Sequence, residues 1–193
     1  YFESVLQDCA AHGVNTVRVW IHCDGRGTPN FSGTGNVTGL PSSFFADLDH
    51  FLEAAEENDL MVILCLWSFD MLKDYRSTAG VNAGMHHHLL LDSLATLSYI
   101  DNVVVPMAQR YNEQCNLLAY EIINEPEWGM DENFLNFETV DSTVPNHFMQ
   151  RFVAMQTKAF HENCDQMVTV GSTSIAWNSE VNGAYGNWWS DSL

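Results

Sequence analysis

Residues 117–128 have the sequence LLAYEIINEPEW, and the interpretation of the whole chain starts from this stretch. It begins as an apolar run of strand length and ends in Asn124, Glu125 and Pro126. Such a run is typical of a buried parallel strand that presents polar groups at its carboxyl end. Because proline lacks the N–H that would continue a ladder, we expect Pro126 to end the strand. The residue before a proline is disfavoured in the helical region, so we expect Glu125 to be extended.

The place of Glu125 in this pattern suits proton transfer. A carboxyl group held beside an apolar strand end is easily desolvated, and desolvation favours its protonated form. The pattern therefore predicts that Glu125 is a general acid. The alternative is a carboxylate that only caps the end of the strand.

Four strand-like runs alternate with helical patterns along the chain. Strands are expected at residues 14–22, 60–67, 117–124 and 166–172, with helices at about 2–12, 41–57, 93–112 (kinked by Pro106) and 145–163. Parallel strands joined by right-handed helical crossovers form either a barrel or an open sheet. The connections after the strands are long and those before them are short. This asymmetry favours a (β/α)8 barrel whose site lies at the carboxyl ends of its strands.

Composition limits the class of protein. The 193 residues are 46% hydrophobic, which is enough for one domain, residues 1–193, with a sizeable core. No apolar run approaches the roughly 18–20 residues of a membrane span. A formal net charge of -18 repels phosphate backbones, so we expect neither nucleic acid nor a membrane as a partner. A neutral polysaccharide is indifferent to that charge.

Two motifs resemble glycoside hydrolase family 5, a family of retaining glycosidases with (β/α)8 barrels. Asn124-Glu125-Pro126 after an apolar strand resembles its acid/base motif. GVNTVRVW, residues 13–20, resembles its second-strand motif with the arginine at Arg18. The motifs lie in the family's order. The resemblance implies a partial (β/α)8 TIM barrel of about four parallel strands, the family's strands two to five, with flanking helices. We therefore expect one partial catalytic domain, truncated at both ends.

The resemblance also implies roles for residues. Glu125 is the expected acid/base, and Asn124 is expected to bond the sugar 2-hydroxyl. The family's arginine pairs with a nucleophilic glutamate on strand seven, which lies beyond Leu193, so this stretch by itself is expected to be inactive. Arg18 needs another partner or solvent, because an unpaired guanidinium in an apolar strand is costly.

Aromatic faces stack on pyranose rings, so tryptophans near strand ends are candidates for substrate contact. We expect Trp67 and Trp128 to contact the sugar and His22 to bond a sugar hydroxyl. Trp20 is expected in the core. Further candidates are Trp177, Trp188 and Trp189, and Glu127 is expected to be structural or solvated.

No cofactor or metal is expected. His86, His87 and His88 are consecutive, and consecutive side chains point in different directions, so they rarely bind one ion. The five cysteines lack a C-x-x-C spacing. Cys115 and Cys164 each precede an expected strand, which leaves open either a disulfide between them or two buried thiols.

The function implied by the resemblance is retaining hydrolysis of β-1,4-linked polysaccharide by a secreted, extracellular enzyme. Mannan or glucomannan is the favoured substrate, because Arg18-Val19-Trp20 and residues 120–126 look most like mannan-degrading members. Endo-β-1,4-glucanase activity on cellulose is one alternative, and a non-catalytic carbohydrate-binding barrel is another. A metal-dependent barrel hydrolase is a third.

Overall fold

The computed structural model describes residues 1–73, 84–131 and 142–174. Its centre is a four-stranded parallel sheet with the order β1-β4-β5-β6. The strands are β1 (Thr16–Cys23), β4 (Met61–Ser68), β5 (Leu117–Asn124) and β6 (Met167–Gly171). All four expected strands are therefore present, in one sheet, and β5 ends just before Glu125 and Pro126 as predicted.

The burial of the strands follows their place in the sheet. β4 lies in the interior of the sheet, and its residues from Leu64 to Ser68 are all buried. β1 and β6 lie at the two edges, and exposed side chains recur along them, including Arg18 and Trp20 in β1. A continuous apolar run thus marks a strand in the interior of the sheet, as expected for a parallel sheet.

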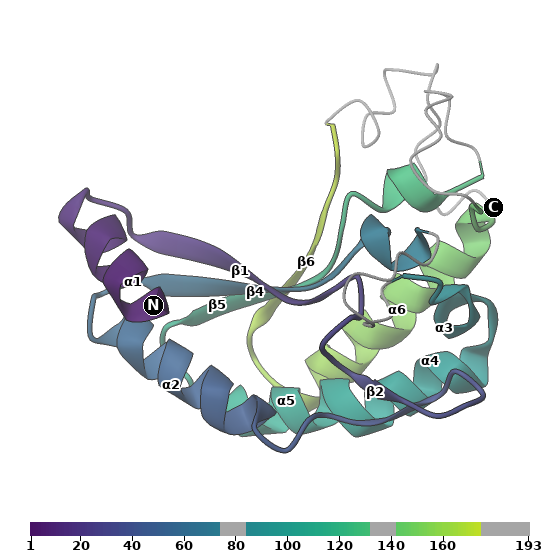
Figure 1. Ribbon diagram of the computed structural model, residues 1–193, viewed down its shortest axis with the longest axis horizontal. Coiled ribbons are helices and arrows are strands. Elements are labelled where there is room, and N and C mark those ends of the chain that lie inside the picture. The colour runs from purple at the N-terminus through teal and green to yellow at the C-terminus, as the bar shows by residue number, and fades with distance from the viewer. Residues whose placement is uncertain (74–83, 132–141, 175–193) are drawn as a thin grey trace.

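Helices cover one face of the sheet, and most of them lie below it in the view of Figure 1. They are α1 (Phe2–Ala11), α2 (Phe44–Glu56), α3 (His87–Leu91), α4 (Ser93–Tyr99), α5 (Val105–Tyr111) and α6 (Asn146–Asn163). Their apolar sides form the core with the strands; Tyr120 of β5, for example, stacks on Phe160 of α6 with ring centroids 4.2 Å apart. Burying each such side chain stabilises the fold by roughly 1.5–3 kcal/mol.

The helical stretch 93–112 is interrupted before Pro106. A π-helical segment, η2 (Ile100–Val104), joins α4 to α5. Pro106 has no N–H to donate to the carbonyl of Asn102, and a wider i→i+5 turn accommodates that missing bond. The expected irregularity is present, but it begins one turn earlier than the proline.

The connection between β1 and α2 contains a short hairpin that the sequence pattern did not predict. Its strands are β2 (Asn30–Phe31) and β3 (Val37–Gly39). The backbone N–H of Val37 donates to Ser98 Oγ at 2.9 Å, and Asn102 Nδ2 donates to the Val37 carbonyl at 3.2 Å. The hairpin is held by these bonds to the helical layer rather than by an apolar alternation of its own.

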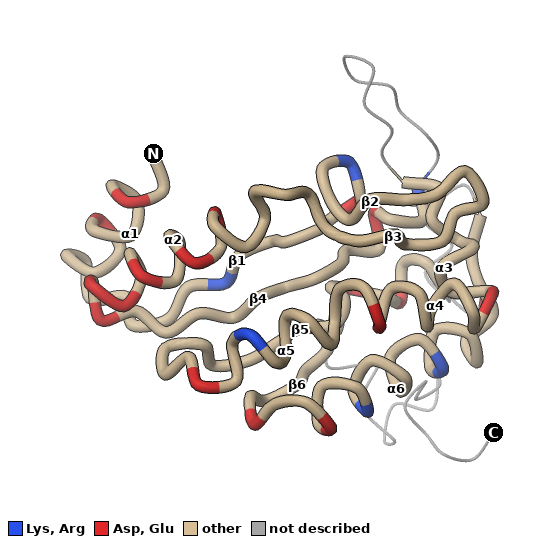
Figure 2. Tube along the Cα trace, turned by 90° about the horizontal axis from the view of Figure 1, so that it is seen from below, with Lys and Arg blue, Asp and Glu red and all other residues tan. Residues whose placement is uncertain are grey.

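Two of the helices, α1 and α2, have acidic residues (Glu3, Asp8, Asp47, Asp49, Glu53 and Glu56) and no Lys or Arg. Figure 2 shows acidic positions along α1 and α2, whereas basic positions appear on α6. This distribution explains how a chain with a net charge of -18 keeps an apolar interior. None of the helices in the described ranges combines the length and the apolar character needed to cross a bilayer.

Candidate active site

Glu125 lies at the carboxyl end of β5 in a left-handed backbone conformation, with φ 49° and ψ 51°. The expectation that it is extended is therefore wrong. Its N–H donates to the carbonyl of Gly171, at the end of β6, at 2.5 Å, and its own carbonyl accepts from the N–H of Trp128 at 3.3 Å. These bonds turn the chain sharply into the 3-10 helix η3 (Pro126–Gly129). A non-glycine residue pays roughly 1–2 kcal/mol for this conformation, and such strain is concentrated at functional sites.

Arg18, the third residue of β1, is paired with Glu121 of β5. The guanidinium donates from Nε to Glu121 Oε2 and from Nη2 to Oε1, both at 2.6 Å. Nη2 also donates to Asn124 Oδ1 at 2.9 Å and to Cys65 Sγ at 3.2 Å. The bond to Glu121 is the largest cause that raises the pKa of Arg18, and the nearby Glu125 carboxylate adds to it. The arginine is thus held in a fixed position beside Asn124 and Glu125.

An irregularity in β5 brings Glu121 and Asn124 to the same face of the sheet. Glu121 pairs with Thr169 and Asn124 with Gly171, so β5 has one residue more than β6 between these two pairs. In a regular strand, residues three apart point to opposite faces. The extra residue reverses that alternation, which is why both side chains reach Arg18.

The site residue that sequence reasoning missed is Glu121. Its side chain is only 6% exposed, and it interrupts an otherwise apolar strand. The signal was present, because a carboxylate in a buried strand requires a cationic partner. Arg18 is a lone cation in another apolar strand, so the two could have been matched.

Two of the predicted sugar-contacting residues are buried instead. Trp67 has no exposed surface and packs against Tyr99 and His22, with ring centroids 5.6 and 4.9 Å apart respectively. His22 is 2% exposed, and burial lowers its pKa to about 3. The prediction that they contact substrate is wrong, because both residues pack beneath the strand ends, on rings from the helical layer and neighbouring loops.

Two other tryptophans lie nearer the surface. Trp20, expected in the core, is 41% exposed, and the Arg18 guanidinium lies 4.8 Å from the centroid of its ring. Trp128 follows Glu125 in η3 and is half-buried beside Phe69, at 6.5 Å between ring centroids. Trp177, Trp188 and Trp189 lie outside the described residues.

The sequence matches a known protein family and individual proteins. A family model described as cellulase (glycosyl hydrolase family 5) matches residues 2–190. The chain belongs to this family. A mannan endo-1,4-beta-mannosidase of Mytilus edulis is 30% identical over 208 residues, which cover 98% of this chain and 54% of that protein. One of Cryptopygus antarcticus is 33% identical over 129 residues, which cover 64% of this chain and 31% of that protein.

Solved structures of family 5 proteins agree with the fold. The beta-mannanase of the blue mussel Mytilus edulis has a TM-score of 0.79 and 29% identity, covering 98% of this chain and 56% of that one. The beta-1,4-D-mannanase of Cryptopygus antarcticus has a TM-score of 0.84 and 26% identity, and the match covers 99% of this chain and 54% of that one. The chain spans about half the length of these relatives. Its four parallel strands and helices are therefore a partial (β/α)8 barrel, as expected.

Glu127, two residues beyond Glu125, has a structural place in this family 5 site. It is fully buried and accepts from Ser172 Oγ at 2.5 Å and from the N–H of Thr173 at 3.2 Å. These bonds join the turn after β5 to the residues after β6. Of the two expected alternatives, structural or solvated, the structure shows the first.

The three consecutive histidines have separate surroundings. His86 stacks on Phe31 at 4.4 Å between ring centroids, and burial lowers its pKa to about 4. His87 Nε2 contacts the Ser142 carbonyl at 2.8 Å, and His88 Nε2 lies 3.8 Å from Asp92 Oδ2. They do not converge on one point. All five cysteines are free thiols, with Cys164 buried and Cys115 exposed, so the disulfide alternative is wrong.

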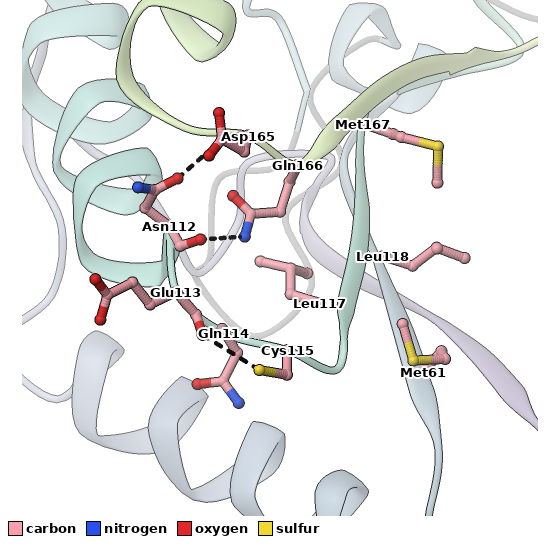
Figure 3. A pocket seen from close by; sticks show the side chains of 10 residues that line it. All are labelled: Met61, Asn112, Glu113, Gln114, Cys115, Leu117, Leu118, Asp165, Gln166 and Met167. Atoms are coloured by element: carbon pink, nitrogen blue, oxygen red, sulfur yellow. Dashed lines mark hydrogen bonds between the residues drawn. The ribbon is translucent and has the colours of Figure 1, made fainter.

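A hollow of about 400 Å³ lies at the opposite end of the strands from Glu125. Figure 3 shows it at the amino ends of β4, β5 and β6. Its lining residues are Met61, Asn112, Glu113, Gln114, Cys115, Leu117, Leu118, Asp165, Gln166 and Met167. In a parallel (β/α) barrel the chemistry takes place at the carboxyl ends, so this hollow is separate from the candidate site.

Proposed function

We propose that this chain supplies the acid/base half of the active site of a retaining endo-β-1,4-mannanase. The observation that carries the proposal is the meeting of Glu125, Asn124 and Arg18 on one rim of the sheet. Arg18 donates to Asn124, and Glu125 follows directly. The family membership supports the reaction class, and the relatives described as mannan endo-1,4-beta-mannosidases support mannan as the substrate.

In the proposed reaction Glu125 transfers a proton twice. Its carboxyl O–H donates to the glycosidic oxygen while the bond from that oxygen to the anomeric carbon breaks and a second carboxylate attacks the carbon. The Glu125 carboxylate then removes a proton from water, and the water oxygen displaces the second carboxylate from the anomeric carbon. Net retention of configuration follows from these two inversions.

The second carboxylate is proposed to come from another strand of the barrel. Retaining enzymes place their two carboxyl groups roughly 5–5.5 Å apart. Of the two acidic residues nearest Glu125 in the described β5–η3 segment, Glu121 has both oxygens bonded to Arg18, and Glu127 is bonded to Ser172 and Thr173. Neither carboxylate is available to attack, so we propose that these residues alone do not hydrolyse mannan.

The remaining binding roles are also part of the proposal. Asn124 and Arg18 orient the sugar near the scissile bond, and Trp128 offers a partly exposed aromatic face. A neutral mannan is compatible with the acidic outer surface of the chain. Because polymeric mannan is too large to cross a membrane, we propose that the enzyme acts outside the cell.

The test is hydrolysis by a polypeptide that carries this chain together with the remaining strands of the barrel. We expect release of manno-oligosaccharides from galactomannan and glucomannan, with retained anomeric configuration by NMR. Exclusive action on carboxymethylcellulose would replace mannan by glucan as the substrate. Binding without hydrolysis of any of these polymers would favour the carbohydrate-binding alternative. Activity lost to a chelator and restored by a metal would favour the metal-dependent one.

A further inference from the structure

We propose that Glu121 is a positioning residue for hydrolysis, which holds Arg18 and, through it, the amide of Asn124 in the orientation that the reaction requires. The proposal rests on the mannanase function above. Glu121 is 103 residues from Arg18 in the sequence, yet the two side chains share two hydrogen bonds of 2.6 Å. Its role goes beyond neutralising a charge, for three reasons.

The first reason is the orientation of Asn124. Arg18 has only donors, so the amide atom that faces Nη2 at 2.9 Å must be the carbonyl oxygen, Oδ1. The NH₂ group of Asn124 is therefore turned away from Arg18, where it is able to donate to a hydroxyl oxygen of a sugar. Without an anchored guanidinium, the amide has no fixed preference between its two orientations. Glu121 supplies that anchor.

The second reason is the proximity of Glu125. The Glu125 carboxylate is close enough to Arg18 to raise the pKa of the guanidinium. An Arg18 side chain that is one-third exposed and lacks another carboxylate would be free to turn toward Glu125. Such a contact would hold the acid/base away from the leaving oxygen. The bidentate bond to Glu121 fixes the guanidinium plane and prevents a contact between Arg18 and Glu125.

The third reason is that β6 leaves space for this carboxylate. A Cβ at Gly171 would lie 2.2 Å from Glu121 Oε1 and 3.5 Å from Asn124 Oδ1. The backbone of Gly171 is not in the left-handed region, so glycine is not needed there for its conformation. It is needed because Glu121 occupies the space where a side chain would be.

The test uses Glu121→Gln in the complete-barrel polypeptide, with Glu113→Gln as the matched control, since Glu113 is exposed and lies before β5. A glutamine places an NH₂ group against the guanidinium, so the bidentate bond is lost. We expect kcat on mannan to fall by about 10²-fold, less than for loss of the acid itself, with KM changed much less.

Two further variants separate positioning from folding. Glu121→Asp keeps the charge and should recover part of kcat. Gly171→Ala keeps every charge but displaces the Glu121 carboxylate, so it should also lower kcat, as Glu121→Gln does. The loss for Glu121→Gln combined with Asn124→Ala should be smaller than the product of the single losses, because both act through one network.

The outcomes distinguish the two proposals. If the parent polypeptide does not hydrolyse mannan, the proposed function fails. If the parent is active and folded Glu121→Gln keeps its kcat, or changes KM as much as kcat, the positioning role fails. Loss of folding in Glu121→Gln, Glu121→Asp and Gly171→Ala alike would assign Glu121 a purely structural role and would also overturn the proposal.

Discussion

The backbone N–H of Glu125 donates to the carbonyl of Gly171 at 2.5 Å, across the ends of two neighbouring strands. This bond accompanies a left-handed conformation at a residue that precedes proline, where local preferences oppose it. The tertiary contact between β5 and β6 therefore decides the direction of the Glu125 side chain. The local preferences of a residue before proline do not set that direction.

This strain predicts an unusual ranking of stabilities. Glycine adopts positive φ without the penalty that a Cβ brings, so Glu125→Gly should be more stable than Glu125→Ala by about 1 kcal/mol. Urea unfolding of the two variants measures the difference. An alanine variant as stable as the glycine variant would show that the left-handed conformation carries no strain.

The two tryptophans near strand ends should differ in what their removal affects. Trp67 is fully buried, so Trp67→Ala should lower the free energy of unfolding by about 3–5 kcal/mol. Trp128 is half-buried in η3, so Trp128→Ala should raise KM for mannan with a smaller change in stability. Thermal unfolding and steady-state kinetics of both variants make the comparison. A Trp128→Ala variant with unchanged KM would remove Trp128 from the substrate site.

The buried histidines should make the fold sensitive to acid. Burial lowers the pKa of His22 to about 3 and that of His86 to about 4, whereas both titrate near 6.5 when unfolded. Between these values the unfolded state binds more protons, so stability falls as the pH falls from about 6.5 towards 4. The slope is at most about 1.4 kcal/mol per pH unit for each histidine.

His22→Phe isolates this contribution from that of the carboxylates. The substitution keeps a ring in the aromatic cluster and removes a titrating group, so the loss of stability between pH 6.5 and 4 should become smaller. His161→Gln is the matched control, because His161 is exposed at the end of α6. Equal pH slopes for His22→Phe and the parent would show that His22 does not titrate in this range.

Periodicity and turn chemistry predicted the strands and most helices, because these elements bury runs of apolar residues with regular spacing. The stop at Pro126 was also predictable, since a missing N–H is a local property. The hairpin Asn30–Gly39 was not, because bonds to Ser98 and Asn102 hold it in place.

Within the candidate site, the positions of Asn124 and Glu125 followed from the motif, but their surroundings did not. That Asn124 also reaches Arg18 depends on one extra residue in β5, which periodicity does not reveal. Trp67 and His22 were misplaced because a residue near the end of a strand can still point towards the helical layer. The sequence pattern did not show on which face of the sheet these two side chains lie.

The most direct test of the central claim is the dependence of Glu125→Ala on the leaving group, measured in the complete-barrel polypeptide. A general acid matters most when the departing oxygen is a poor leaving group. We predict that kcat/KM on unactivated mannan falls by about 10²–10⁴-fold or more, whereas formation of the glycosyl-enzyme from an aryl mannoside with a strongly acidic phenol changes little. Equal losses on both substrates, or no loss on mannan, would contradict the role of Glu125 as the acid/base.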